Sequence, residues 1–210
     1  GYTATSGFTA SVNLFQNYSD NDYRVDARIL NLQTSMYEPG TTSVRRFHDA
    51  YHNETIIAKA GVVNKSYADQ LLLGLNVGNE SAQDQTGTQM QYVYGQRHRK
   101  ANTITPFLVY SKKNLFIKGL DARLTANYNF GYSRFIDTAK VRYNWLGQSA
   151  PKLSPGEFRY SSAKYYNNDV NITFNADYKL NDRHSFSLSN ILSLFNRKGK
   201  DPFNYSEESH

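Results

Sequence analysis

The sequence predicts an all-β protein, an antiparallel up-and-down meander of about eight strands. One observation behind this prediction is the set of long runs in which apolar and polar residues alternate with a period of two. The other is that short and long connections alternate along the chain. The short ones are polar turns at Ser19–Asp22, Asn64–Asp69, Lys112–Asn114 and Asn181–Arg183, and the long ones span roughly Ser35–Asn53, Asn79–Asn102, Ser133–Asn167 and Arg197 onward.

The clearest strand is Gly119–Ser133. Every even-numbered residue from Leu120 to Tyr132 is apolar or aromatic, whereas the odd-numbered residues between them are polar or glycine. A helix cannot satisfy this period, and the run exceeds the roughly 9–11 residues with which a tilted strand crosses a bilayer. Its small and aliphatic residues come first and its aromatic residues last. This order predicts a hydrocarbon-facing band that leads to an aromatic girdle at the loop end.

The remaining strands alternate less completely. The pattern is regular in Phe8–Leu14, Tyr23–Ile29 and Val170–Leu180, and weaker in residues 54–64, 70–78 and 103–111. In His184–Leu194 the phase slips by one at Ile191-Leu192, which predicts a β-bulge. Pro106 lies within residues 103–111 and weakens the prediction there, because proline cannot donate a hydrogen bond to a neighbouring strand.

The composition fits a barrel wall that faces lipid on one side and water on the other. Hydrophobic residues are only 39% of the 210 residues, although there are 17 Tyr and 12 Phe. In an outer-membrane barrel every second residue faces a wet lumen and is polar, which accounts for the low apolar fraction. No stretch approaches the ~20 apolar residues of a transmembrane helix. We therefore expect a segment of a transmembrane outer-membrane β-barrel.

Several charged residues fall on the polar face of the expected strands. They are Arg24, Asp26, Arg28, Asp121 and Arg123. A charge on the lipid face costs about 2–4 kcal/mol near mid-bilayer, so these residues are expected to face the lumen. They form either an ion-pair ladder that stiffens the wall or contacts that hold a domain inside the barrel.

Several segments together resemble a known family. These are Lys113–Leu120 with Asn127–Gly131, the hairpin Asn175–Ser185, and Phe195–Asp201. They resemble the β-barrel portion of TonB-dependent outer-membrane receptors, most closely those of the Bacteroidetes group. The resemblance spans most of the chain and implies a larger protein with an N-terminal plug domain, a TonB-contacting segment and a 22-stranded barrel.

The whole chain, residues 1–210, is then expected to be a single segment of barrel wall without the plug domain and the remaining strands. Residues 1–20 have no basic start followed by an apolar core, as a signal peptide would. The end, Glu207–His210, is expected to lie within an extracellular loop. The two edge strands of such a slice are expected to be prone to association.

Three loop clusters hold the candidate ligand-binding residues. They are Arg45, Arg46, His48, Tyr51 and His52, then Tyr92, Tyr94, Arg97 and Arg99, then Arg159, Tyr160 and Tyr165. Aromatic rings stack on sugars, and guanidinium groups bind anionic oxygens, so these residues suit sugars or ferric chelates. For any one of them a solvated loop position is the simpler interpretation. His48 and His52 are four residues apart, but nothing nearby completes a metal shell, and no metal or other cofactor is expected.

The expected function is import of a scarce nutrient, such as a siderophore, vitamin or glycan, by energised gating in the bacterial outer membrane. No catalytic arrangement is recognisable, so the protein is not expected to be an enzyme. Expected partners are outer-membrane lipid and lipopolysaccharide, the plug domain and TonB, and a small-molecule or glycan ligand. Nucleic acid is not expected despite the net charge of +6, because no reading motif is present. The alternatives are a complete small eight-stranded barrel acting as an adhesin or structural anchor, and a soluble secreted β-barrel that binds carbohydrate.

Overall fold

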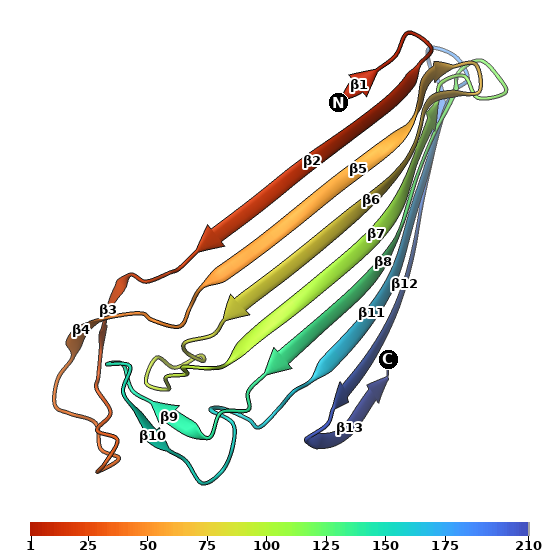
Figure 1. Ribbon diagram of the computed structural model, residues 1–210. Coiled ribbons are helices and arrows are strands. Elements are labelled where there is room, and N and C mark those ends of the chain that lie inside the picture. Colours follow the sequence, from red (N-terminus) through yellow and green to blue (C-terminus); the bar gives the residue numbers. More distant parts are fainter. Residues whose placement is uncertain (210) are drawn as a thin grey trace.

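The computed structural model describes the backbone of residues 1–209 and the side chains of residues 1–204. Within these residues, nine strands form one antiparallel sheet in the order β1-β2-β5-β6-β7-β8-β11-β12-β13. Figure 1 shows the long strands side by side as a curved wall: β2 Phe8–Ser19, β5 Tyr51–Lys65, β6 Ala68–Gln83, β7 His98–Lys112, β8 Leu120–Ile136, β11 Lys164–Lys179 and β12 Ser185–Asp201. The short strands β1 (Tyr2–Thr3) and β13 (Asn204–Ser209) form the edges, so the sheet is open. The predicted all-β antiparallel meander is confirmed.

The connections are sorted by length between the two ends of the wall (Figure 1). At the short-turn end, β5 turns directly into β6, β7 into β8 and β11 into β12. At the opposite end lie the long connections 20–50, 84–97 and 137–163. Two of them contain hairpins of their own, β3 (Arg24–Ala27) with β4 (Thr42–Arg45) and β9 (Val141–Tyr143) with β10 (Ser149–Pro151).

The prediction of a wall strand at Tyr23–Ile29 is wrong. The chain leaves the sheet after Ser19, and Asn21, with a φ of 51°, donates its side-chain amide to the Asp49 carbonyl where the loop returns. Ser19–Asp22 is therefore the start of a long loop and not a tight turn. The alternation in residues 23–29 is real, but its apolar residues pack within the loops and do not line the wall. Arg24, Asp26 and Arg28 consequently lie in a loop hairpin, away from the polar face of the wall.

The expected bulge at Ile191-Leu192 is also wrong. β12 pairs with β11 in unbroken register from Ser185 to Lys200, so Ile191 simply occupies a position on the polar face, where it is exposed. The irregularity in this region lies between Gly199 and Asp201, where β12 pairs with β13. The stretch from Arg197 onward, expected as a loop, therefore continues as strand to Asp201 and returns as β13. Of the expected loop end Glu207–His210, the last residue lies outside the described chain.

The register gathers most of the apolar side chains of the seven long strands on one face, which we call the apolar face. One row of directly opposite residues across it, from β2 to β12, is Ala10, Ala60, Leu73, Leu108, Ala126, Ile172 and Leu192. The opposite or polar face is joined by side-chain hydrogen bonds, such as Asn129 Nδ2 to Asp169 Oδ2 at 2.9 Å and Ser193 Oγ to Asn171 Oδ1 at 2.8 Å.

Pro106 occupies an interior strand at a small cost in pairing. It lies opposite Leu75 of β6, but the pairing of β7 with β8 lapses between Ile104 and Phe107. Phe107 then lies opposite Gly74, and its ring fills the space that a Cβ of Gly74 would need. Both residues lie on the polar face, where the large ring covers the position at which the glycine has no side chain.

The substitution Gly61→Ala tests how closely β5 and β6 approach each other. A methyl group at Gly61 would overlap the main-chain carbonyl of Leu71 on the neighbouring strand, and backbone atoms cannot yield as a side chain can. We expect the free energy of unfolding to fall by about 1–3 kcal/mol, measured by urea unfolding followed by circular dichroism.

The matched control is Gly131→Ala in β8, where the nearest atoms to the added methyl are at 3.4 Å. There we expect no loss and a gain of up to about 1 kcal/mol from reduced freedom of the unfolded chain. Equal losses at the two positions would contradict the register described above.

Candidate ligand-binding site

The three long connections pack together into one unit, which we call the loop platform (residues 20–50, 84–97 and 137–163). Its buried apolar cluster draws on all three: Ala27, Ile29, Val44, Val93 and Trp145. Trp145, only 2% exposed, donates its indole N–H to the Met90 carbonyl at 2.8 Å. Val93 also forms a backbone bridge with Tyr143. Because the loops share a core, they hold side chains in fixed relative positions.

One carboxylate connects the third loop to the second, and another holds the third loop to itself. Glu157 accepts backbone N–H groups from Gly95, Gln96 and Arg97 at 2.6, 2.9 and 2.7 Å. Asp137 accepts those of Glu157, Phe158 and Arg159, at 2.5, 2.9 and 2.8 Å.

Hydrogen bonds to a charged group contribute about 1.5–3 kcal/mol each, more than neutral ones. The segment 157–159 is thus held by the end of β8, and the segment 95–97 is held in turn by Glu157.

Buried amides connect the other loops. Gln85 is fully buried, and its Oε1 accepts the backbone N–H groups of Phe47 at 2.8 Å and His48 at 3.2 Å. Asn144, 1% exposed, donates to the Leu30 carbonyl at 3.1 Å. Sequence reasoning missed both residues, because an amide in a polar loop cannot be told from a solvated one without its partners.

A groove of about 580 Å³ opens beside the platform at the loop end of the polar face, and we call it the mouth groove. It is lined by Asp84, Thr86, Gly87, Thr88, Gln89, Tyr92, Tyr94, Arg97, Arg99, Phe135 and Phe158. The Arg97 guanidinium lies 5.1 Å from the centre of the Tyr94 ring and 5.5 Å from that of Phe158. Its Nε is 3.4 Å from Asp84. All four residues of the second predicted cluster therefore line this groove, whereas Arg159, Tyr160 and Tyr165 of the third cluster do not.

The groove continues along the wall as alternating cations and rings. Arg99 lies opposite Phe135 in the register, and the Phe135 ring meets Tyr165 edge-on at 6.1 Å between centroids. The Arg197 guanidinium lies 4.1 Å above the Tyr165 ring. Rings and guanidinium groups in this order can stack on sugar rings and bind anionic oxygens.

A second groove of about 550 Å³ lies on the platform, and Tyr92 lines both grooves. Its walls include Tyr37, Arg142 and Tyr143. Arg142 donates to Ser35 Oγ at 2.9 Å and to the Leu32 carbonyl, so it supports the loop as well as lining the groove. The exposed Tyr92 ring therefore stands between two polar, aromatic hollows.

The first predicted cluster is not part of the mouth groove. Arg45 pairs with Asp22 at 2.6 Å on the surface, and Arg46 pairs with Asp49 at 3.0 Å beneath the Tyr23 ring. Both arginines are engaged within their own loop.

Its other members lie at a separate groove or in the wall. His48 Nε2 is 2.8 Å from the Arg97 carbonyl, and His52 Nε2 is 3.3 Å from Glu54. These two histidines line a groove of about 460 Å³ with His98. Tyr51 is the first residue of β5.

The remaining predicted residues have varied surroundings. Arg159 is exposed, and only its backbone is fixed, by Asp137. Tyr160 stacks on Phe203 with 4.0 Å between centroids. Asp121 and Arg123 do lie on the polar face of β8, near the short-turn end, where Asp121 accepts the N–H of Asn114 at 3.0 Å.

Arg24 and Arg28 contact their own loop. Arg24 donates to the Ser43 carbonyl at 3.4 Å, and Arg28 lies over the Tyr37 ring at 5.3 Å. Within the described side chains, no three His, Asp or Glu residues group closely enough to hold a metal ion.

Among the residues of the mouth groove and its extension that sequence reasoning missed are Asp84, Phe135 and Arg197. A usable signal was present for Phe135, because continuing the β8 alternation past Ser133 places it on the polar face. Asp84 and Arg197 carried no such signal, since each acquires its role only through a ring or cation from another segment.

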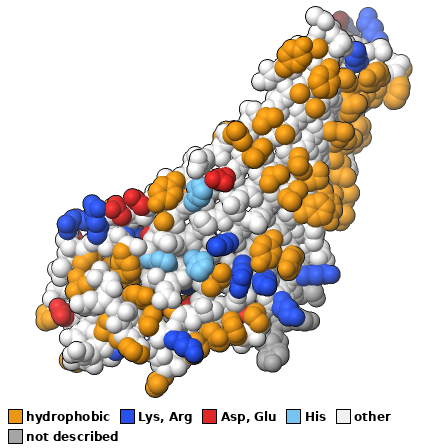
Figure 2. Space-filling model, in the orientation of Figure 1, with side chains coloured by type: hydrophobic (Ala, Val, Ile, Leu, Met, Phe, Trp, Pro, Cys, Tyr) orange, Lys and Arg blue, Asp and Glu red, His pale blue; other side chains and the backbone are white. Residues whose placement is uncertain are grey.

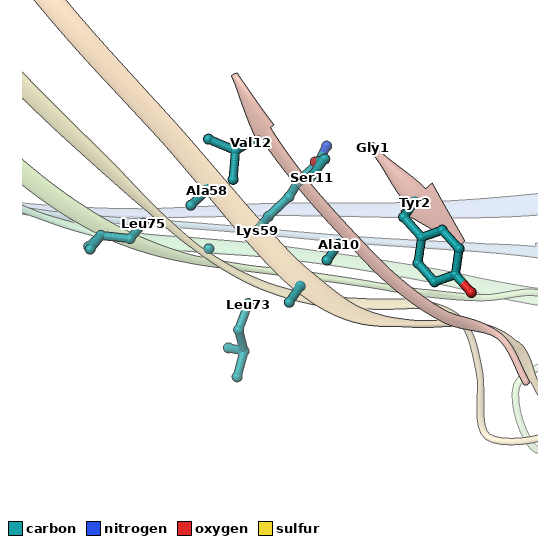
Figure 3. A pocket seen from close by; sticks show the side chains of 11 residues that line it. Gly1, Tyr2, Ala10, Ser11, Val12, Ala58, Lys59, Leu73 and Leu75 are labelled. Atoms are coloured by element: carbon teal, nitrogen blue, oxygen red, sulfur yellow. The ribbon is translucent and has the colours of Figure 1, made fainter. Parts of the chain in front are cut away.

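A further hollow, of about 770 Å³, lies on the wall itself, where β1 pairs with β2 (Figure 3). It forms where Ala10, Ala58 and Ala60 take the place of larger side chains beside Leu73 and Leu75. Lys59 supplies its only charged side chain, so this hollow suits an apolar occupant better than a polar ligand.

Comparison of the chain with protein-family models, curated proteins and solved structures finds no match. The described residues include no helix long and apolar enough to cross a membrane. The ligand chemistry is therefore inferred from the side chains of the site.

Removing the Asp137 carboxylate tests how the platform is held. In Asp137→Ala, three backbone N–H groups lose their shared acceptor, and we expect residues 157–159 and 95–97 to open more readily by about 2–4 kcal/mol. Hydrogen–deuterium exchange measures this as loss of protection in both segments. Glu38→Ala, which removes an exposed carboxylate of the same platform, is the control and should leave that protection unchanged.

The buried tyrosine of the groove predicts a pH effect. Burial raises the pKa of Tyr94, and the neighbouring Arg97 cation only partly opposes this rise. Folding therefore favours the neutral phenol, and this preference stabilises the folded state. The stabilisation is complete below the unfolded-state pKa of about 10, and it is lost as the pH rises through the higher pKa of the folded state. We expect the melting temperature of Tyr94→Phe to fall less between pH 9 and pH 11 than that of the wild type. An equal fall would refute this, and Tyr92→Phe, at an exposed ring, is the control.

Proposed function

We propose that the chain is part of the barrel wall of a TonB-dependent outer-membrane receptor of the Bacteroidetes type, which imports a scarce nutrient by energised gating without a covalent step. The observation that carries this proposal is the continuous apolar face over seven strands. Many of its side chains are well exposed, including Leu14 at 72%, Leu73 at 66% and Leu188 at 60%. So large an apolar surface is stable only against another apolar phase or partner.

The opposite face supports a lumen. Its hydrogen-bonded Asn, Asp, Ser and Thr side chains suit contact with water inside a barrel. The open edges at β1 and β13 support a wall that further strands complete, because unpaired edges are otherwise prone to association. In this arrangement the short turns face the periplasm, and we expect Asp121 and Arg123 to contact the plug domain.

The mouth groove is the proposed ligand site. It opens at the loop end of the polar face, which is the entrance to the lumen in the proposed orientation. The Arg97 cation beside two neighbouring rings, with the Asp84 carboxylate next to it, favours a polar ligand that has ring surfaces and oxygen atoms. A ferric chelate, a cobalamin-type vitamin or a glycan has this chemistry.

The test is uptake by cells of the source organism with and without the gene. Radiolabelled ferric siderophores, cobalamin and oligosaccharides are supplied one at a time, in the presence and absence of a protonophore. We expect one substrate class whose uptake needs both the gene and the proton gradient, and fractionation should place the protein in the outer membrane. The proposal would be ruled out if deletion of the gene left uptake unaffected, or if fractionation showed the protein to be soluble.

Arg97→Ala tests the groove itself. Loss of the guanidinium removes two cation–π contacts and the pairing with Asp84, so we expect binding of the imported substrate to weaken about tenfold or more. Equilibrium binding to isolated outer membranes measures the change. Arg45→Ala removes a surface arginine from the same platform and should bind normally; weakening by both variants alike would place the ligand elsewhere.

A further inference from the structure

A row of four cations crosses the apolar face of the wall at its loop end, and we call it the cationic row. Its members lie directly opposite one another on consecutive strands, in the order Lys100 (β7), Arg134 (β8), Lys164 (β11) and Lys200 (β12). Figure 2 shows Lys and Arg side chains gathered where the hydrophobic part of the wall meets the loops.

The cationic row lacks compensation within the described side chains. Like charges directly opposite on neighbouring strands destabilise a sheet. None of the four cations forms an ion pair there, and Arg134 donates instead to the hydroxyl of Ser162, at 2.8 and 3.1 Å. The carboxylate of Glu54 is on the same face, in β5, but it lies 3.3 Å from His52 and forms no ion pair with the row. An anion from outside these residues would relieve the repulsion.

The position of the row indicates what kind of anion. Along β8, the apolar face presents Phe130, then Tyr132, then Arg134. Tyr132 pairs with Tyr166 of β11, with 5.2 Å between ring centroids. Two residues of strand span about 7 Å, so the cations lie that far beyond the paired rings. Apolar, aromatic and cationic rows in this order match the hydrocarbon, interface and headgroup levels of a lipid layer.

A groove adjoins the row and provides further donors. It has a volume of about 460 Å³ and is lined by Lys100 together with Ser81, Tyr18 and the histidines His48, His52 and His98. Ammonium, hydroxyl and imidazole groups around one hollow can bind several oxygens of a phosphate.

We propose that the cationic row and this groove bind the phosphate groups of an anionic glycolipid of the outer leaflet. The inference rests on the proposed function, because a lipid reaches this face only if the face lies in a membrane. A lipid contacts the apolar, aromatic and cationic rows together, whereas a free phosphate would leave the first two unexplained.

The test uses the full-length protein that carries this sequence, purified from membranes in a mild detergent. Native mass spectrometry measures its binding of phosphorylated lipid A and of the enzymatically dephosphorylated form. The test variant is Lys100→Gln, Lys164→Gln, Lys200→Gln. The control, Lys65→Gln, Lys113→Gln, Lys118→Gln, removes the same charge at the short-turn end.

We expect the wild type and the control to bind the phosphorylated lipid about tenfold or more tightly than the dephosphorylated one, and the test variant to lose this preference. Replacing the same three lysines by arginine keeps the charge and should keep the preference, which separates loss of charge from misfolding. A preference that survives in the test variant would overturn the inference. The inference would also be overturned if inorganic phosphate bound the wild type but not the test variant and displaced the lipid at equal phosphate concentration.

Fractionation of the source cells keeps the two proposals separable. If the wild-type protein is absent from the outer membrane, the proposed function fails and takes this inference with it. If it is present there and the test variant still prefers the phosphorylated lipid, only the inference fails.

Discussion

Antiparallel backbone pairing in continuous register is the constraint on which the rest of the structure depends. Because side chains alternate between faces, a slip of one residue in any strand would move its whole apolar set to the other face. The register from β2 to β12 avoids this, so that residues as far apart in sequence as Ala10 and Leu192 lie in one apolar row. The polar face, the position of the loops and the row of cations all follow from the same pairing.

The loop platform is stabilised by a different kind of interaction. It has a small apolar cluster around Trp145, and it also has buried and half-buried acceptors that each satisfy two or three backbone N–H groups. Asp137, Glu157 and Gln85 together connect all three loops. Backbone groups without secondary structure need such partners when they are buried. The result is a rigid surface built from long connections, on which side chains keep fixed positions.

Two chemically distinct surfaces arise at the same end of the wall, one on each face. On the polar face, Arg97 and its neighbouring rings line the mouth groove, which suits a polar ligand that enters a lumen. On the apolar face, the cationic row with Lys100 and Lys164 follows the aromatic pair and suits anionic headgroups. Period-two alternation explains why neighbours in sequence serve different surfaces: Arg99 faces the groove, and Lys100 belongs to the row.

The sequence by itself determined the local features: the all-β class, the strands with regular alternation such as β8, and the separation of short turns from long loops. It misassigned residues 23–29, because alternation marks any strand with one buried face and does not reveal which surface buries it. It misassigned the phase at Ile191, because an apolar residue on the polar face resembles a slip in the alternation. Only the tertiary structure decided which loops share a core, that Arg97 lies beside the rings of Tyr94 and Phe158, and that four cations stand in one row. These features are contacts between residues distant in sequence, and they depend on register and loop packing, which local periodicity does not encode.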